Sequence, residues 1–284
     1  MRNLLLFVGI FASLFANAQE LEKSLLWKIS GKGLKSPSYL FGTIHATCDA
    51  TLDANTLKAL DETKQLFLEI DMDDKAMPMQ MMKYMKMNDD EKLSTLLSAE
   101  DFEIVDVFLK ENMKMSAKMF DTFKPFMVSA MLMPKLLDCK YAAVESELMR
   151  VTKEQNEEVY GLEKVEEQMK VFDAIPYQTQ ADELLKTAKN GLEKDKVEFQ
   201  KMMETYKSGD IEAMLVMMDD SDNKITSENK DVLLNNRNKN WVPLIIKTAK
   251  EMPTFFGVGA GHLAGDEGVI KLLRKKGDSV EAVK

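Results

Sequence analysis

The sequence predicts an α/β fold: a central mixed sheet built from strand–helix–strand units near both ends of the chain, with a large, mainly helical middle insertion. Short apolar runs alternate with helix-like segments near both ends, whereas the middle is rich in Met, Lys and Asp. The only two histidines each close a Gly-x-x-His pattern, Gly42–His45 and Gly259–His262, directly after an apolar run. These matching settings predict one site built from both ends.

The N-terminus reads as a secretory signal peptide, residues 1–18. A single basic residue precedes the apolar stretch Leu4–Phe15, and Ala16–Ala18 forms a small-x-small cleavage signal. The apolar stretch is too short for an ordinary membrane span, although an uncleaved N-terminal anchor is the alternative. We expect a bacterial protein, periplasmic or secreted, with a single domain over residues 19–284 and no transmembrane segment after cleavage.

Charge and cysteine usage narrow the partners and the compartment. The formal net charge of −9 argues against nucleic acid as a partner. Cys48 and Cys139 are the only cysteines, and export favours a disulfide between them over a thiol metal site or a nucleophile. Such a bridge would connect the loop that follows His45 to the middle of the chain.

The first unit begins with two strands. Leu25–Ile29 and Ser38–Ile44 are apolar runs separated by turn residues, as in a hairpin-like connection. Asp53–Lys64 then reads as a helix with an Asp N-cap, and Gln65–Ile70 as a buried strand.

Two polar side chains follow the strands of this unit, His45 and Glu69. A strand–helix–strand unit normally lays its two parallel strands side by side, so we expect both side chains at the carboxyl ends of neighbouring strands. That edge is where open α/β sheets bind ligands. The alternative is a strand-end carboxylate that only reaches solvent.

The middle insertion, about residues 72–155, reads as helices. The segments that look helical are Met77–Met87, Ala99–Asn112, Lys124–Cys139 and Ala143–Gln155. The many methionines of the first segment favour core packing, with a soft-metal site or an adaptable apolar groove as alternatives.

A second carboxylate stands at a strand-to-helix junction. Glu157–Leu162 predicts a short strand that leads into Glu163, and Lys164–Asp173 predicts a helix. The alternative is an acid that only complements the helix dipole. Further helices are expected over about residues 177–250. They include Arg237, whose planar guanidinium suits a carboxylate or an oxyanion; a surface or packing arginine is the alternative.

The last unit repeats the layout around His45. Thr254–Val258 predicts a strand, the loop with His262 follows, and Asp266–Lys276 and Ser279–Val283 predict a helix and a final strand.

Two histidines and a carboxylate are a suitable ligand set for a divalent transition metal. We predict His45 and His262 with Glu69 or Glu163, since zinc often takes two His and one Glu with an open position for water. Mixed nitrogen and oxygen ligands also suit manganese, iron or cobalt. The remaining carboxylate is a candidate general base, and Arg237 is a candidate oxyanion donor.

Other mechanisms stay open. The sequence contains no G-x-S-x-G nucleophile elbow, no HExxH pair and no Walker A loop. A metal-free enzyme is an alternative, in which one histidine acts as the base and Glu69 orients it. A binding protein without hydrolytic activity is another.

The chain resembles the TraB/GumN family, bacterial relatives of the TIKI proteases. The matching stretches are SYLFGTIHA, LFLEID, GLEKVEEQ, NNRNKNW and GVGAGHLAGDEGVIKLLRKKGDSV. The resemblance implies an α/β fold shared with erythromycin esterase-like and ChaN-like proteins, and two histidines that meet in one site. It also implies a metal-dependent peptidase site. We predict a peptidase acting on peptide or protein amides, with manganese, cobalt or zinc as the ion. The alternative that the resemblance implies is a ChaN-like protein that binds haem or another ligand.

Two positions depart from the family pattern. Relatives often carry Asp-x-x-Leu in the helix before the GLE stretch, where this chain has Glu145 and Leu148. If that acid is a ligand, its geometry would change, so Glu145 is not among the predicted site residues. The usual final Gly-Tyr pair reads Gly277-Asp278.

Overall fold

The computed structural model describes residues 21–284 except residue 32. The predicted signal peptide therefore lies outside the described residues. Within the described part of the chain, no helix has the length and apolarity that a membrane crossing requires.

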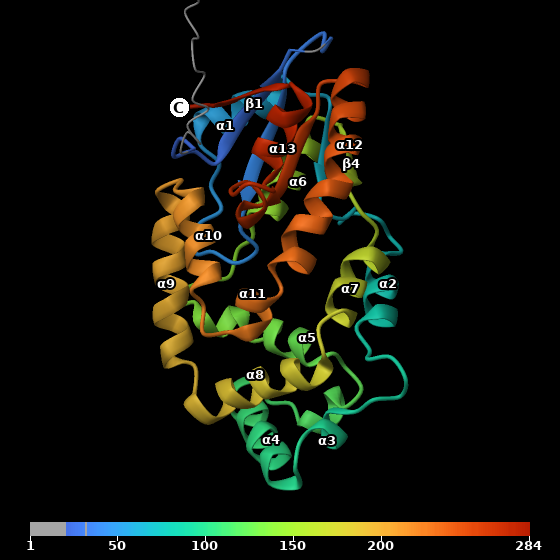
Figure 1. Ribbon diagram of the computed structural model, residues 1–284, viewed down its shortest axis with the longest axis vertical. Coiled ribbons are helices and arrows are strands. Elements are labelled where there is room, and N and C mark those ends of the chain that lie inside the picture. Colours follow the sequence, from blue (N-terminus) through green and yellow to red (C-terminus); the bar gives the residue numbers. More distant parts are fainter. Residues whose placement is uncertain (1–20, 32) are drawn as a thin grey trace, which may run out of the picture.

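One sheet of six strands forms the upper part of Figure 1, in the order β4-β3-β5-β2-β1-β6. The strands are β1 (Leu26–Ser30), β2 (Ser38–Thr43), β3 (Gln65–Leu68), β4 (Glu158–Gly161), β5 (Phe255–Gly259) and β6 (Ser279–Ala282). β4, β3, β5 and β2 are parallel, and β1 runs antiparallel to both of its neighbours. The predicted mixed sheet, and the hairpin that opens it, are confirmed.

The expectation that β2 and β3 lie side by side is wrong. β5 lies between them and pairs with both, through Leu40↔Phe256 on one side and Phe67↔Phe256 on the other. The reason is composition: Phe255, Phe256 and Val258 are fully buried, and a strand that is apolar on both faces belongs in the middle of a sheet. β5 and β6 are likewise parallel but separated by two strands, so the last unit does not repeat the pairing of the first.

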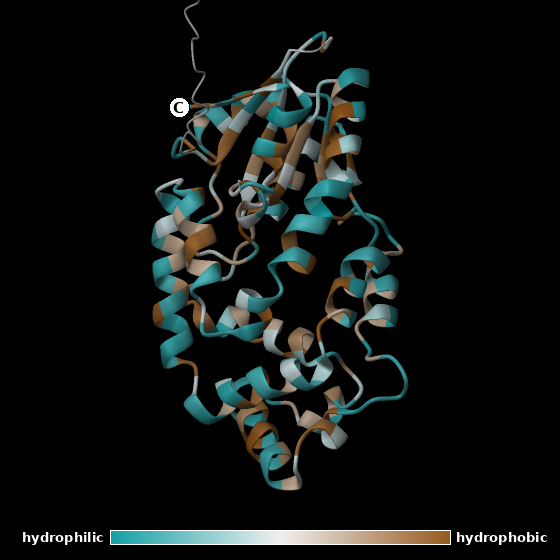
Figure 2. Cartoon of the chain, in the orientation of Figure 1, coloured by the Kyte–Doolittle hydropathy of each residue, from teal (hydrophilic) through white to brown (hydrophobic). Residues whose placement is uncertain are grey.

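Helices cover both faces of the sheet. On one face, α12 (Asn236–Glu251) and α13 (Val269–Lys276) share a hydrophobic core with the strands. On the other face, α1 (Ala54–Asp61), α6 (Val144–Glu154) and α9 (Glu193–Lys207) do so. α10 (Ile211–Asp219) contributes to both cores. Figure 2 shows hydrophobic residues along the strands between these two layers.

The predicted helical middle is confirmed, and part of it forms a lobe with a core of its own. Four helices build this lobe at the bottom of Figure 1: α3 (Leu93–Leu96), α4 (Ala99–Met113), α5 (Pro125–Ala130) and α8 (Tyr177–Asn190). The remaining α-helices are α2 (Met77–Tyr84), α7 (Val165–Asp173) and α11 (Lys224–Glu228).

A proline accounts for one local difference from the expected helices. The helix expected over Lys124–Cys139 is α5 followed by a short 3-10 turn, Met133–Leu136, because Pro134 has no N–H to continue an α-helix. α12, in contrast, continues through Pro243 without ending there.

The methionines of α2 are mainly packing residues. Met77, Met81 and Met85 pack against a small core shared with α7, as the core-packing interpretation predicts. That interpretation is wrong for Met79 and Met82, whose exposed fractions are 72% and 57%.

Cys48 and Cys139 form the predicted disulfide, with their Cα atoms 5.6 Å apart. An isolated β-bridge between Thr47 and Ala142 lies next to it. The loop that follows His45 is therefore joined to the segment before α6 by both a covalent bond and backbone hydrogen bonds.

Removing the disulfide should destabilise the protein. The bridge closes a loop with a sequence separation of 91 residues, so the Cys48→Ala/Cys139→Ala variant should lose roughly 2–5 kcal/mol of unfolding free energy. Urea denaturation followed by circular dichroism measures this, with reduced wild-type protein as the control. An unchanged denaturation midpoint in both samples would contradict the stabilising role.

Candidate active site

Three of the predicted residues lie at one edge of the sheet. Glu69 directly follows β3, Glu163 follows β4, and His262 ends the short 3-10 helix Ala260–His262 after β5. Because these strands are parallel, their carboxyl ends meet at the same edge, as the sequence predicts for strand-end residues. Arg237 joins them from the first turn of α12.

The Arg237 guanidinium bridges the two carboxylates. Its Nη2 lies 2.6 Å from Glu69 Oε2 and 2.6 Å from Glu163 Oε1, and its Nε donates to Glu163 Oε1 at 3.0 Å. The guanidinium also lies over the Trp241 ring, 4.6 Å from the centroid, and Nη1 donates to the Leu233 carbonyl. Only 12% of the Arg237 side chain is exposed, so this is a buried ion cluster rather than a surface pair.

Glu69 is held as an anion. Burial alone would raise its pKa. The electrostatic effects of Arg237, His262 and His45 and the Gly259 N–H together outweigh burial and hold the pKa of Glu69 well below its usual range. Gly259 donates its N–H to Glu69 Oε1 at 2.8 Å, and Gln168 Nε2 donates to Oε2 at 3.0 Å. A Cβ at Gly259 would stand 3.2 Å from the same oxygen, so glycine permits this close approach.

Glu163 is the carboxylate that takes up a proton more easily. Burial raises its pKa, and the negative charge of Glu69 adds to the rise, although Arg237 opposes both. Trp241 Nε1 contacts Glu163 Oε2 at 3.2 Å. Two acids whose environments move their pKa values apart are a pattern typical of acid–base sites.

His262 is buried and neutral. Burial lowers its pKa to about 3. Its Nδ1 lies 2.6 Å from Asn238 Oδ1, while Asn238 Nδ2 donates to the carbonyl of Glu267 at 2.9 Å. A carbonyl can only accept, so the NH2 group of Asn238 faces Glu267 and its amide oxygen faces His262. Nδ1 of His262 therefore carries the proton, and Nε2 carries the lone pair. Nε2 lies 3.0 Å from Arg237 Nη1 and 3.6 Å from Glu69 Oε1.

His45 stands at the same edge but has a different partner. Its side chain is 61% exposed, and its Nδ1 lies 2.8 Å from Glu145 Oε1. Desolvation by the surrounding protein acts to lower the pKa of His45, but the hydrogen bond and charge of Glu145, with the charge of Glu69, outweigh it and raise the pKa to about 9. Its charge also reaches the buried cluster, where it lowers the pKa of Glu69 and of His262.

Three polar residues that contact the predicted ones, besides Trp241, were absent from the predicted set. Asn238 and Gln168 belong to the motif stretches but had no assigned role, and Glu145 was left out because it departs from the family pattern. Their signal in the sequence is weak, because each is a polar residue on a helix whose buried face is not apparent from local pattern.

The donor set fits a metal ion in part. Among residues 21–284 without residue 32, no group of three His, Cys, Asp or Glu side chains is arranged as a metal site. The 3.6 Å between His262 Nε2 and Glu69 Oε1 is nevertheless close to the separation of about 3.4 Å expected for two ligands of one tetrahedral ion. His262 and Glu69, two of the three predicted ligands, therefore stand at a suitable spacing. Arg237 Nη1 contacts the same nitrogen of His262, Nε2.

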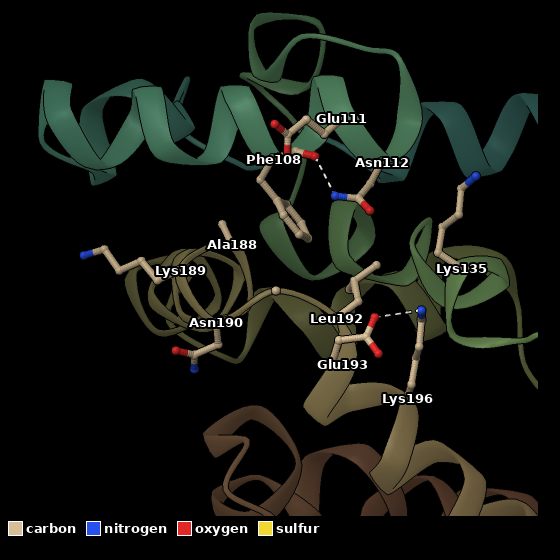
Figure 3. Close-up of a pocket in the computed structure, with 11 residues that line it drawn as sticks. Phe108, Glu111, Asn112, Lys135, Ala188, Lys189, Asn190, Leu192, Glu193 and Lys196 are labelled. Atoms are coloured by element: carbon tan, nitrogen blue, oxygen red, sulfur yellow. Dashed lines mark hydrogen bonds and ion pairs between the residues drawn. The ribbon is translucent and has the colours of Figure 1, made fainter.

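A separate hollow of about 600 Å³ lies in the helical lobe (Figure 3). Its walls come from α4, the end of α8, the start of α9 and Lys135, and none of the candidate site residues lines it. Lys196 and Glu193 on its rim pair with each other at 2.9 Å. The hollow is therefore distinct from the cluster at the sheet edge.

Removing the Arg237 charge should destabilise the fold. The Arg237→Met variant leaves Glu69 and Glu163 buried without their common cation, so the unfolding free energy should fall by about 3–5 kcal/mol. Arg150→Met is the matched control, because Arg150 pairs with acids on an exposed helix surface and should change stability little. Urea denaturation of both variants measures the difference. Equal denaturation midpoints would contradict a stabilising role of Arg237 in the buried cluster.

Comparison with known proteins identifies one family. A search of curated proteins and a search of solved structures each found no match. The family model for the TraB/PrgY/gumN family matches residues 25–282, which include both Gly-x-x-His patterns and every residue of the site. The match covers nearly the whole of the described chain, and the chain therefore belongs to the TraB/PrgY/gumN family.

Proposed function

We propose that this protein is an exported, metal-dependent hydrolase that cleaves peptide or protein amides. The observation that carries the proposal is His262, a buried, neutral imidazole whose Nε2 lone pair faces Glu69 and Arg237 at the sheet edge. Family membership supports the same site, because both Gly-x-x-His patterns lie within the match.

His262, Glu69 and His45 are the residues that would hold a divalent ion, with manganese, cobalt or zinc as candidates. When bound, such an ion polarises a carbonyl and lowers the pKa of a bound water. His262 presents a lone pair rather than a proton because Asn238 fixes its tautomer. Glu69 stays ionised at neutral pH, as a ligand must.

Glu163 and Arg237 supply the remaining chemistry in this proposal. Glu163, the carboxylate with the raised pKa, is suited to accept and return a proton. Each nitrogen of the Arg237 guanidinium has a hydrogen-bond partner. Nη1 donates to the neutral His262 ring at Nε2 rather than to a carboxylate. That contact is the one we expect a substrate oxyanion to replace.

Export is part of the proposal. The disulfide between Cys48 and Cys139 supports an oxidising compartment, in agreement with the periplasmic or secreted location expected from residues 1–18.

Metal analysis combined with a peptide-library screen tests the proposal. Tag-free protein should carry one ion per chain and cleave peptides, and chelation should stop the cleavage. His262→Ala should lose both the ion and at least about 10²-fold in rate, because a ligand is removed, while the surface variant Met79→Ala should match wild type. Cleavage by metal-free protein would disprove metal dependence. No cleavage together with a shifted Soret band on haem addition would favour the haem-binding alternative.

Metal affinity should increase with pH. His45 is protonated below a pKa of about 9, so an ion that binds its imidazole must displace a proton. Between pH 6 and 8 the affinity should rise by about tenfold per pH unit, with proton release on binding. Calorimetry in buffers of different ionisation enthalpy measures the affinity and the number of protons released. The His45→Gln variant should show a weaker dependence of affinity on pH. A pH-independent affinity in wild type would exclude His45 as a ligand.

A further inference from the structure

We propose that Glu145 is a positioning residue for His45. It would hold the Nδ1–H of the imidazole so that Nε2 is the nitrogen available to the site. The geometry is direct: Glu145 Oε1 lies 2.8 Å from His45 Nδ1. The acid is buried, with 5% of its side chain exposed, whereas the imidazole is 61% exposed. A buried acid thus fixes one nitrogen of a histidine and leaves the other accessible.

Glu145 has little else to satisfy it. The Thr43 side chain and the backbone N–H of Glu145 also lie near the carboxylate. Besides the ion pair with His45, however, neither oxygen has a hydrogen-bond partner of normal geometry. Its place in the first turn of α6 offers some compensation from the helix dipole. Burying a carboxylate with so few partners is costly, so a purely structural role would be better served by an apolar side chain.

The backbone around His45 is fixed by the same segment that carries Glu145. The Tyr141 hydroxyl donates to the His45 carbonyl at 2.6 Å. Thr47 and Ala142 exchange two backbone hydrogen bonds of 2.9 Å, and the disulfide joins Cys48 to Cys139 beside them. Residues 139–145 therefore set both the position of His45 and the side chain that orients its ring.

The two histidines differ in the group that holds Nδ1. An amide oxygen of Asn238 holds His262, and a carboxylate of Glu145 holds His45. A carboxylate makes the opposite nitrogen more basic, which an amide does to a much smaller degree. The consequence for hydrolysis rests on the proposed function, but the orientation of His45 does not.

Nuclear magnetic resonance of imidazole nitrogens tests the orientation in metal-free protein. With only two histidines in the chain, each signal can be assigned by single substitution. In wild type at pH 7, His45 should show a slowly exchanging, hydrogen-bonded Nδ1–H. In Glu145→Gln this signal should move and exchange faster, and Glu145→Asp should restore part of it. Absence of a protected Nδ1–H in wild type overturns the proposal without any variant.

Glu147→Gln is the matched control. Glu147 lies two residues further along α6 and pairs with Arg150 at the surface, so its loss should leave the His45 signals unchanged. The His262 signals should stay constant in every variant and report that the fold is intact. Equal effects of Glu145→Gln and Glu147→Gln on His45 would overturn the proposal.

Kinetics separate this inference from the proposed function. If the protein is a hydrolase, Glu145→Gln should lower kcat by about 10–100-fold with little change in KM. A change in KM alone would overturn the positioning role. If no activity is found, the resonance measurements on metal-free protein still decide whether Glu145 orients His45.

Discussion

The site depends on one guanidinium placed between two buried carboxylates. Arg237 contacts Glu69 and Glu163 at 2.6 Å each, and the His262 that completes the cluster is neutral. Two carboxylates and one guanidinium leave the buried cluster with an excess of negative charge. Such a cluster favours a cation or a proton. The pKa of Glu163 is raised by burial and by the charge of Glu69, whereas the electrostatic effects of Arg237, His262 and His45 lower that of Glu69.

The order of the strands determines which residues meet this guanidinium. Because β5 lies between β2 and β3, the C-terminal histidine is placed beside Glu69 while His45 stands one strand further along the edge. Short apolar runs and caps such as Asp53 identify strands and helices from local sequence, and most of them are found where expected. Strand neighbours are not local properties, and only the apolar character of β5 on both faces indicates a central place.

The same distinction explains which site residues the sequence reveals. Glu69, Glu163 and His262 follow strands, and the carboxyl ends of parallel strands share one edge, so their meeting is predictable. Asn238, Gln168 and Glu145 come from helices, where the partner of a polar side chain depends on how the helix packs. For Glu145 the cysteine pair is a sequence signal besides the family pattern, because it brings residue 139 to residue 48 and so α6 to the first histidine.

The two Gly-x-x-His patterns therefore place similar residues in unlike environments. His262 is buried against Trp241, with an amide on Nδ1 and a guanidinium on Nε2, and these neighbours favour the neutral ring. His45 is exposed and pairs with a carboxylate, which favours the protonated ring. Unlike partners allow one ring to keep a constant lone pair while the other gains and loses a proton, so the paired motif is best understood as two different functional groups at one sheet edge.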